Sequence, residues 1–269
     1  MYYEEIRPHP IIAKFVKLIW IQEFNSPGKS VQIERIVADG IVEVVFHFGD
    51  PFITYYADNT VEKQPTSFAI AQLNRPIQIQ PNGRIGIIAI RFFPWGAYHF
   101  FNTPIHEFAD KAIDIKYLWQ EKGLEVEDRI NNARSNKERL DIIETFLIQQ
   151  LSQNYGKQST ADPLIKYVQC YKGKLSIDEL LEKTGISERT LERKFRSSVG
   201  ISPKQLSRLT RFLHSCKCLR QQSLKSLTQI GLECGYHDQA HFIRDFNHFS
   251  GLTPKEFRLN LKIHYFELD

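Results

Sequence analysis

Three arginines near residue 190 are spaced so that they can act on one ligand together. Arg189, Arg193 and Arg196 are four and three residues apart, which places them on one side of an α-helix. A guanidinium group donates hydrogen bonds in a rigid fork that fits the O6 and N7 atoms of guanine, and it also pairs with phosphate. Leu191 and Phe195 fall on the opposite side of this helix. The pattern predicts a helix that enters a DNA major groove, and a solvated charged face is the alternative.

Polar residues extend this candidate surface, and a similar row follows about fifty residues later. Thr190 and Glu192 lie beside the arginines. The later row lies opposite three phenylalanines and consists of Gln239, His241, Arg244 and Asn247. We expect Arg193 and Arg244 to contact bases and Arg189 and Arg196 to contact phosphates.

Both rows belong to a duplicated segment. Ser176–Gly185 returns 50 residues later as Ser226–Gly235, and the offset is 51 residues where Phe195 returns as Phe246. Each copy has a capping serine, a short apolar helix pattern, a glycine for a tight turn and a second helix. We therefore expect two helix-turn-helix units, with second helices at about 188–199 and 238–249.

A helix predicted from Pro203 to about Arg220 connects the two units. It presents Leu206, Leu209 and Leu213 on one side, as a helix does that packs on a core. A rigid connection would hold the second helices at a fixed separation. Successive major grooves on one face of DNA are about 34 Å apart, so double-stranded DNA is the partner that this arrangement predicts.

The segment from Leu164 to Leu259 resembles the DNA-binding domain of the AraC/XylS family of bacterial transcription regulators. The motifs that carry the resemblance are Gly235–Phe246 (GYHDQAHFIRDF) and Gly251–Arg258 (GLTPKEFR). The resemblance implies base contacts from Arg189, Glu192 and Arg193 in the first unit, and from Gln239, His241 and Arg244 in the second. It also implies an N-terminal sensor or dimerisation domain, often cupin-like.

The N-terminal part of the sequence predicts β-structure. Short runs rich in Ile, Val, Phe and Tyr alternate with turn signals, which favours an antiparallel sandwich or barrel. The runs are Val31–Val37, Ile41–Phe48, Phe52–Ala57, Ser67–Gln72, Pro76–Gln80 and Arg84–Phe93. The last run is almost continuously apolar, so we expect it to be buried on both faces. The fold class predicted is α+β, with a cupin-like β-domain followed by an all-α double helix-turn-helix domain.

The expected domains are a β-rich effector or dimerisation domain at 1–155, a linker at 156–163, and the DNA-binding domain at 164–269. The first domain ends in helical patterns, where Leu140, Ile143, Leu147 and Leu151 form a stripe that packs either within the chain or against a second copy. Asp162 is expected to cap the first helix after the linker, with Pro163 at its first position.

Charge is divided unevenly between the two halves. From Lys157 onward the chain has 19 Lys+Arg and 12 Asp+Glu, a net charge of +7, whereas residues 1–156 have a net charge of −3. This excess suits contact with phosphates. No apolar run approaches the ~18 residues of a membrane helix, and the N-terminus has no signal-peptide pattern, so we expect a cytoplasmic protein without a membrane partner.

Neither a catalytic site nor a cofactor is expected. The sequence has no Gly-x-Ser-x-Gly motif and no phosphate loop, and His47 with Glu43 is too small a set for a metal-dependent cupin. Tyr55, Tyr56, Phe92, Trp95 and Tyr98 are candidates to line a small-molecule pocket or simply to form a core. The four cysteines lie at none of the usual zinc spacings, so we expect buried thiols and no metal. They are Cys170, Cys216, Cys218 and Cys234.

The sequence therefore favours a DNA-binding transcription regulator and not an enzyme. Candidate partners besides double-stranded DNA are a small-molecule effector, a second copy of the chain and RNA polymerase. The alternative is a small-molecule-binding or enzymatic cupin-like protein whose helical half mediates protein contacts.

Overall fold

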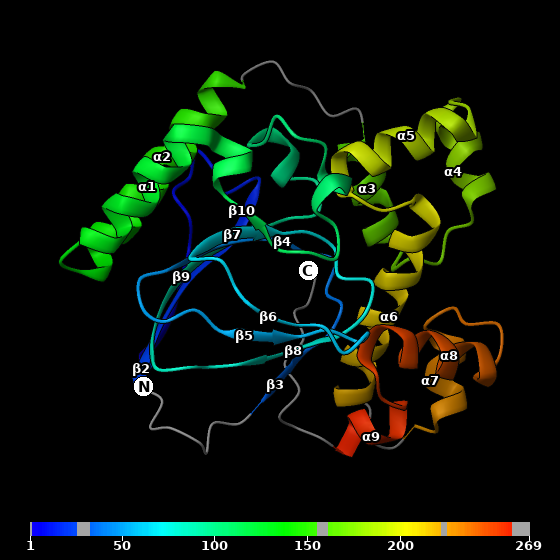
Figure 1. The fold of residues 1–269 in the computed structure, drawn as a ribbon. Helices are drawn as coiled ribbons and strands as arrows, with labels where there is room; N and C mark the ends of the chain where they lie inside the picture. The colour runs from blue at the N-terminus through cyan, green and yellow to red at the C-terminus, as the bar shows by residue number, and fades with distance from the viewer. Residues whose placement is uncertain (1, 26–32, 155–160, 222–224, 260–269) are drawn as a thin grey trace.

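The N-terminal half is built on two antiparallel sheets that lie face to face (Figure 1). The computed structural model describes residues 2–25, 33–154, 161–221 and 225–259. The larger sheet has the order β1 (Tyr2–Ile6), β2 (Val16–Asn25), β9 (Arg84–Phe92), β4 (Val42–His47), β7 (Ser67–Ile70) and β10 (Ile113–Asp114). The smaller sheet has the order β3 (Glu34–Ile36), β8 (Ile77–Gln80), β5 (Ile53–Tyr55) and β6 (Val61–Lys63). The predicted α+β class with an N-terminal antiparallel sandwich is confirmed.

Strand β9 is the centre of this half. Every residue of the strand after Arg84 is buried, which confirms the prediction of burial on both faces. Ile88 and Ile90 belong to the core beneath the helices, whereas Ile87 and Ala89 belong to the core between the sheets. The alternation of side chains across a strand divides them in this way.

Four strands were missed in the sequence, and each gives a weak pattern for a physical reason. Four of the five residues of β1 and all of β6 are exposed, so neither shows apolar alternation. In β2 a register shift between Val16 and Leu18 changes the phase of the apolar residues. Strand β10 has only two residues. The first residues of the run predicted at Val31–Val37 lie outside the described part of the chain.

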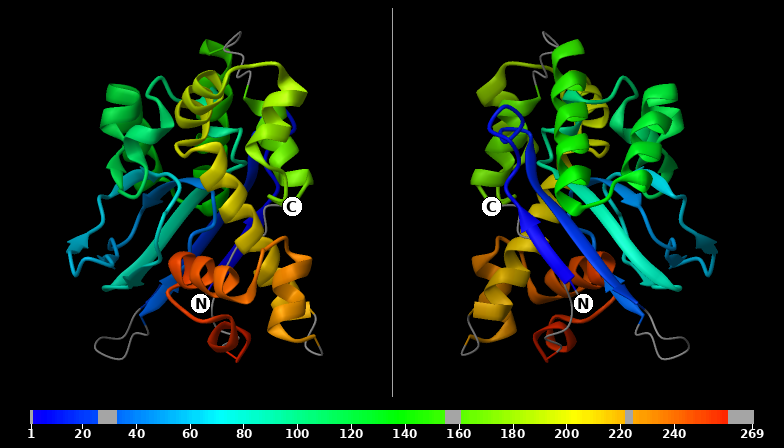
Figure 2. Two further views of the ribbon diagram at one scale, coloured as in Figure 1. Left: turned by 90° about the vertical axis from the view of Figure 1, so that its right-hand side faces the viewer. Right: turned by 90° about the vertical axis from the view of Figure 1, so that its left-hand side faces the viewer.

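Two antiparallel helices, α1 (Lys116–Asn132) and α2 (Asn136–Gln153), cover the outer face of the larger sheet (Figures 1 and 2). Ile143 and Leu147 are at most 1% exposed, and Leu140 and Leu151 pack partly buried against the same core. The apolar stripe of α2 therefore packs within the chain, which confirms the first of the two interpretations. Two short 3-10 helices precede α1, namely η1 (Ala97–His99) and η2 (Ile105–Phe108).

The C-terminal part is entirely helical. Its elements are α3 (Asp162–Cys170), α4 (Ile177–Thr184), α5 (Glu188–Val199), α6 (Pro203–Gln221), α7 (Leu227–Glu233), α8 (Gln239–Ser250) and α9 (Pro254–Leu259). Helix α6 joins one group of helices, α3–α5, to the other, α7–α9 (Figure 1). Within the described part of the chain, no helix combines the length and apolar character needed to cross a bilayer.

The cap predicted for the first of these helices is wrong. Ala161, not Asp162, is the N-cap of α3, and Pro163 lies in the first turn. The Asp162 carboxylate instead lies 2.9 Å from the Nε2 atom of His99 in η1. Because Asp162 is already the first residue of α3, it does not occupy the position of a cap. Most of the expected linker lies outside the described residues, and the domain boundaries stay predictions.

Candidate nucleic-acid interface

The first helix-turn-helix unit consists of α4, a tight turn and α5. Ser176 and Glu179 form a capping box at the start of α4, and Gly185 ends this helix with a φ of +64°. A positive φ favours glycine because a side chain there would be strained. The Ser187 hydroxyl oxygen then accepts a hydrogen bond from the backbone N–H of Thr190 and starts α5. Local sequence signals therefore fix where the second helix begins and how it is oriented.

Helix α5 separates an apolar side from a cationic one. Leu191 and Phe195 are fully buried, whereas Arg189, Arg193 and Arg196 are exposed. The phase predicted from the sequence is therefore the phase that the structure has. This arrangement leaves three guanidinium groups accessible on one side of the helix, as insertion into a groove would require.

Two predicted contact residues of this helix are less accessible. Thr190 and Glu192 are half-buried. The hydroxyl of Ser187 donates to the Thr190 hydroxyl oxygen at 3.0 Å, so Thr190 helps to build the helix start. Its predicted contact with DNA would have to coexist with this hydrogen bond.

The second unit repeats the design in α7 and α8. Ser226 and Gln229 form the capping box of α7. Asp238 caps α8 by accepting a hydrogen bond from the backbone N–H of His241 at 2.7 Å. This bond holds the pKa of the Asp238 carboxyl below its usual value. The cap therefore stays ionised at neutral pH, next to the positive end of the helix dipole.

Helix α8 exposes most of its predicted contact residues. Gln239, Arg244 and Asn247 are exposed, and His241 is half-buried. The ring of His241 packs edge-on against Tyr236 at 5.2 Å between centroids, and its Nε2 atom lies 3.6 Å from a carboxylate oxygen of Asp245. One side of His241 is therefore held by the protein, while its accessible part remains on the outer side of α8.

Asp245 anchors this helix to the connecting helix. It is 4% exposed, and its Oδ1 atom accepts a hydrogen bond from the Nη2 of Arg208 in α6 at 2.8 Å. The Asp245 carboxylate is therefore engaged inside the protein. No local pattern in the sequence indicates this pair, because Arg208 and Asp245 are 37 residues apart and lie on different helices.

Three of the five aromatic residues that were candidates for a pocket or a core make contacts within the β-rich half. The Phe92 side chain is fully buried in the core, Tyr55 donates to Gln80, and Trp95 donates to the carbonyl of Lys14. A depression of about 540 Å³ lies at one end of strands β1, β2 and β9. Its lining is Tyr2, Glu23, Phe24, Asn25, Phe48, Arg84, Ile85 and Gly86, so it contains none of the five predicted aromatic residues.

The pair considered for a cupin-like metal site is engaged in other contacts. Glu43 accepts hydrogen bonds from Trp20 and from Arg91, both at 2.7 Å. His47 is 1% exposed and lies 3.0 Å from the side-chain oxygen of Gln64. Burial lowers the pKa of His47 to about 4. Both side chains therefore take part in contacts within the β-rich half.

Two segments of the chain match known family models. Residues 180–260 match a model described as a helix-turn-helix domain, and residues 4–114 match a domain of unknown function, DUF6597. Among curated proteins, the HTH-type transcriptional regulator ArgR of Pseudomonas aeruginosa is 36% identical over 84 residues. The HTH-type transcriptional activator RhaR of Escherichia coli is 31% identical over 87 residues. The C-terminal helical part contains a helix-turn-helix domain, and it is similar to the corresponding parts of these transcription regulators.

The match to these relatives covers only part of each chain. The alignments cover 31% of this chain and 25% of ArgR, and 32% of this chain and 30% of RhaR. A solved probable AraC family transcriptional regulator from Rhodopseudomonas palustris is 28% identical over 35% of this chain and 90% of its own, with a TM-score of 0.33. Apo ToxT from Vibrio cholerae is 11% identical over 90% of this chain and 97% of its own, with a TM-score of 0.46.

The β-rich half contacts both helix-turn-helix units. Gly200, at the end of α5, lies so close to η2 that an added Cβ would be 3.1 Å from the side chain of Ile105. At the end of α8, the backbone N–H of Ala38 donates to the carbonyl of Phe249 at 3.1 Å. Arg35 donates to the carbonyls of Ser250 and Gly251, both at 3.3 Å. The positions of α5 and α8 in this structure are therefore coupled to the sheets.

Proposed function

We propose that this protein is a sequence-specific DNA-binding regulator of transcription that inserts α5 and α8 into successive major grooves. One observation carries the proposal: two capped helix-turn-helix units expose polar rows on their second helices and share one connecting helix. In this function Arg193 and Arg244 contact bases, and Arg189 and Arg196 contact phosphates. The protein acts in the compartment that holds the DNA, which in a bacterium is the cytoplasm, and it needs no catalytic activity.

Control by a small molecule at the β-rich half would act through the contacts between the halves. A ligand changes an equilibrium only by its different affinity for the two states. Ile105 contacts the end of α5, and Arg35 contacts the end of α8. A state in which these contacts change would therefore hold α5 and α8 at a different separation or orientation. RNA polymerase and a second copy of the chain are the protein partners that fit a regulator of this kind.

The test is binding of the full-length protein to labelled duplexes that tile the region upstream of its own gene. Fluorescence anisotropy at two salt concentrations, with a scrambled duplex as control, measures affinity and salt dependence. We expect one tile to bind at least ~10³-fold more tightly than the scrambled duplex, and the salt slope to report the number of phosphate contacts. If all tiles bind equally, the assay is repeated with genome-derived fragments that were selected for binding to the protein. If these fragments also bind no more tightly than the scrambled duplex, recognition is not sequence-specific.

A further inference from the structure

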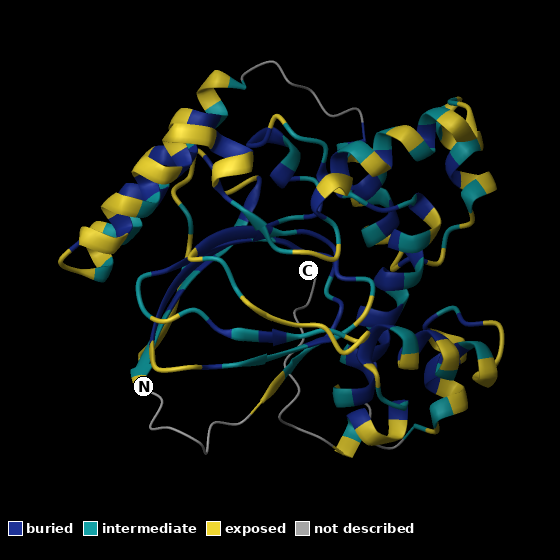
Figure 3. Cartoon of the chain, in the orientation of Figure 1, coloured by how far each residue is buried: buried dark blue, intermediate teal, exposed yellow. Residues whose placement is uncertain are grey.

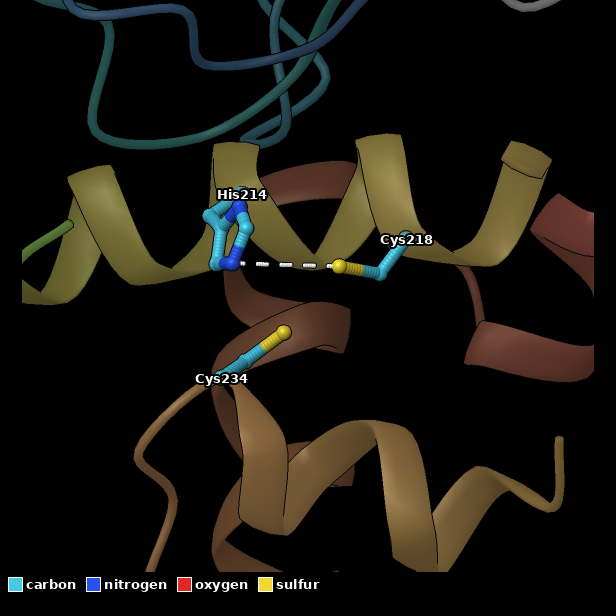
Figure 4. Close-up of side chains that lie close together, drawn as sticks. All are labelled: His214, Cys218 and Cys234. Atoms are coloured by element: carbon cyan, nitrogen blue, oxygen red, sulfur yellow. Dashed lines mark hydrogen bonds between the residues drawn. The ribbon is translucent and has the colours of Figure 1, made fainter. Parts of the chain in front are cut away.

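Three potential metal ligands meet where the connecting helix packs on the second unit. His214 and Cys218 are four residues apart on α6, so they lie on the same side of that helix. Cys234 is the C-cap of α7. The three donor atoms all lie within 4.8 Å of one another, and Figure 4 shows the side chains pointing into the space between the two helices. None of these residues has a role in the proposed contacts with DNA.

We propose that His214, Cys218 and Cys234 bind one thiophilic metal ion, of the Zn²⁺ or Cu⁺ type. The distance between Cys218 Sγ and His214 Nε2 is 3.8 Å. Bond lengths of about 2.3 Å to sulfur and about 2.0 Å to nitrogen place neighbouring ligands of one ion about 3.5–4 Å apart. The cluster therefore needs only a small contraction to hold an ion.

The donor set and its surroundings favour this class of metal. Cys218 is 5% exposed, and Cys234 is fully buried. Thiolate ligands select zinc and copper(I) over magnesium or calcium, which prefer oxygen. Two thiolates and a neutral imidazole carry a charge of −2, which Zn²⁺ cancels, so the complex avoids most of the cost of a buried net charge. His214 is only half-buried, which leaves solvent access for a water molecule as a fourth ligand.

Sequence reasoning expected no metal and buried thiols. Burial is correct for Cys216, Cys218 and Cys234 and wrong for Cys170, which is exposed. The cluster was missed because Cys234 is 16 residues beyond Cys218, and only the packing of α7 on α6 brings them together. A bound ion would join α6, which both units share, to the end of α7 in the second unit.

The experiment uses the reduced, chelator-treated full-length chain. Titration with Co²⁺, as a spectroscopic substitute for Zn²⁺, should give thiolate-to-metal charge-transfer absorption that saturates at one ion per chain. Zn²⁺ should displace Co²⁺. Zn²⁺ added to the metal-free chain should release the two thiol protons and raise the Tm by about 4 °C or more. Competition with chelators, with a parallel anaerobic Cu⁺ titration, decides which of the two ions is preferred.

Matched variants locate the site. Cys218→Ser, Cys234→Ser and His214→Gln should each weaken binding at least about tenfold, whereas Cys170→Ser and Cys216→Ser should leave it unchanged. Circular dichroism of the metal-free variants separates loss of a ligand from loss of fold, and His214→Gln alters a half-buried position that is the least demanding for folding. Unchanged binding in the three cluster variants, binding lost with Cys170→Ser, or no saturable binding by the reduced wild-type chain would overturn the proposal.

Discussion

Arg193 and Arg244 are equivalent residues of the two units. They are 51 residues apart in the sequence, as Phe195 and Phe246 are, and both are exposed on the outer side of their helices while the phenylalanines are fully buried. We expect Arg193→Ala and Arg244→Ala each to cost about 1–3 kcal/mol of binding to the preferred duplex, and to leave binding to a scrambled duplex nearly unchanged. Fluorescence anisotropy with both duplexes measures the difference.

The matched control is Arg129→Ala, which removes an exposed arginine from α1, far from both rows in the sequence. It should change neither affinity beyond the small effect of net charge. Equal losses on the preferred and scrambled duplexes would assign Arg193 or Arg244 to the DNA backbone instead of the bases.

Asp245 is a residue whose role is stability. Its replacement by alanine leaves the guanidinium of Arg208 without its carboxylate partner at 2.8 Å. Since Arg208 remains about one-third exposed, water compensates part of the loss, and we expect Asp245→Ala to lower stability by about 1–3 kcal/mol. Thermal unfolding measures this. Asp141→Ala, at an exposed carboxylate of α2, should stay within about 0.5 kcal/mol; a similar effect of both variants would show that the ion pair adds no stability.

His47 makes stability depend on pH. Its Nε2–H faces the Gln64 oxygen at 3.0 Å, and its Nδ1 has no hydrogen-bond partner among the described residues, so a second proton would be buried without an acceptor. Its pKa is about 4 in the folded chain against an ordinary 6.5. Between these values the unfolded state binds the proton and the folded state does not. The contribution of neutral His47 to the free energy of unfolding is therefore complete above pH 6.5 and is lost as the pH falls toward 4.

Comparison with His47→Gln isolates this contribution, because glutamine keeps a donor toward Gln64 and does not titrate. From pH 7 to pH 4, wild type should lose about 2–3 kcal/mol of unfolding free energy relative to the variant. Parallel urea denaturation curves at several pH values provide the measurement. A constant difference across this range would mean that His47 titrates alike in both states.

At the scale of elements, helices α3–α8 were predictable to within a few residues, whereas α9 was missed. Each of the two recognition helices starts at a capping side chain, Ser187 or Asp238, and each unit opens with a serine of a capping box. Such signals act between neighbours in the sequence, so they are visible without tertiary structure. Strands β1 and β6 lack a local signal, because pairing with other strands and not an apolar pattern holds them in place.

Substitutions of Gly185 test whether the turn of the first unit constrains the chain before α5. Its φ is +64°, and among the described residues nothing lies within 4 Å of the position that a Cβ would take. The cost of a side chain is therefore purely that of the backbone, and Gly185→Ala should lower stability by about 1 kcal/mol. Gly185→Asn should cost less, because asparagine tolerates this conformation better. Thermal unfolding of both variants measures these differences. If Gly185→Ala is as stable as wild type, the turn does not require a glycine.

At the scale of the whole molecule, the two units share α6 and both touch the β-rich half. Contacts at Ile105 reach the first unit, and contacts at Arg35 and Ala38 reach the second. These contacts join residues up to 216 positions apart, so no local pattern in the sequence could have indicated them. The separation and orientation of α5 and α8 are thus properties of the complete chain.

The most direct test of two recognition helices on one DNA is methylation interference on the preferred duplex with the full-length protein. Modification of guanine N7 should block binding at two clusters on one face of the duplex, about 10–10.5 base pairs apart. Arg193→Ala should remove the effect at one cluster only, and Arg244→Ala at the other only. A single cluster, or loss of both clusters in either variant, would contradict independent insertion of α5 and α8 into successive major grooves.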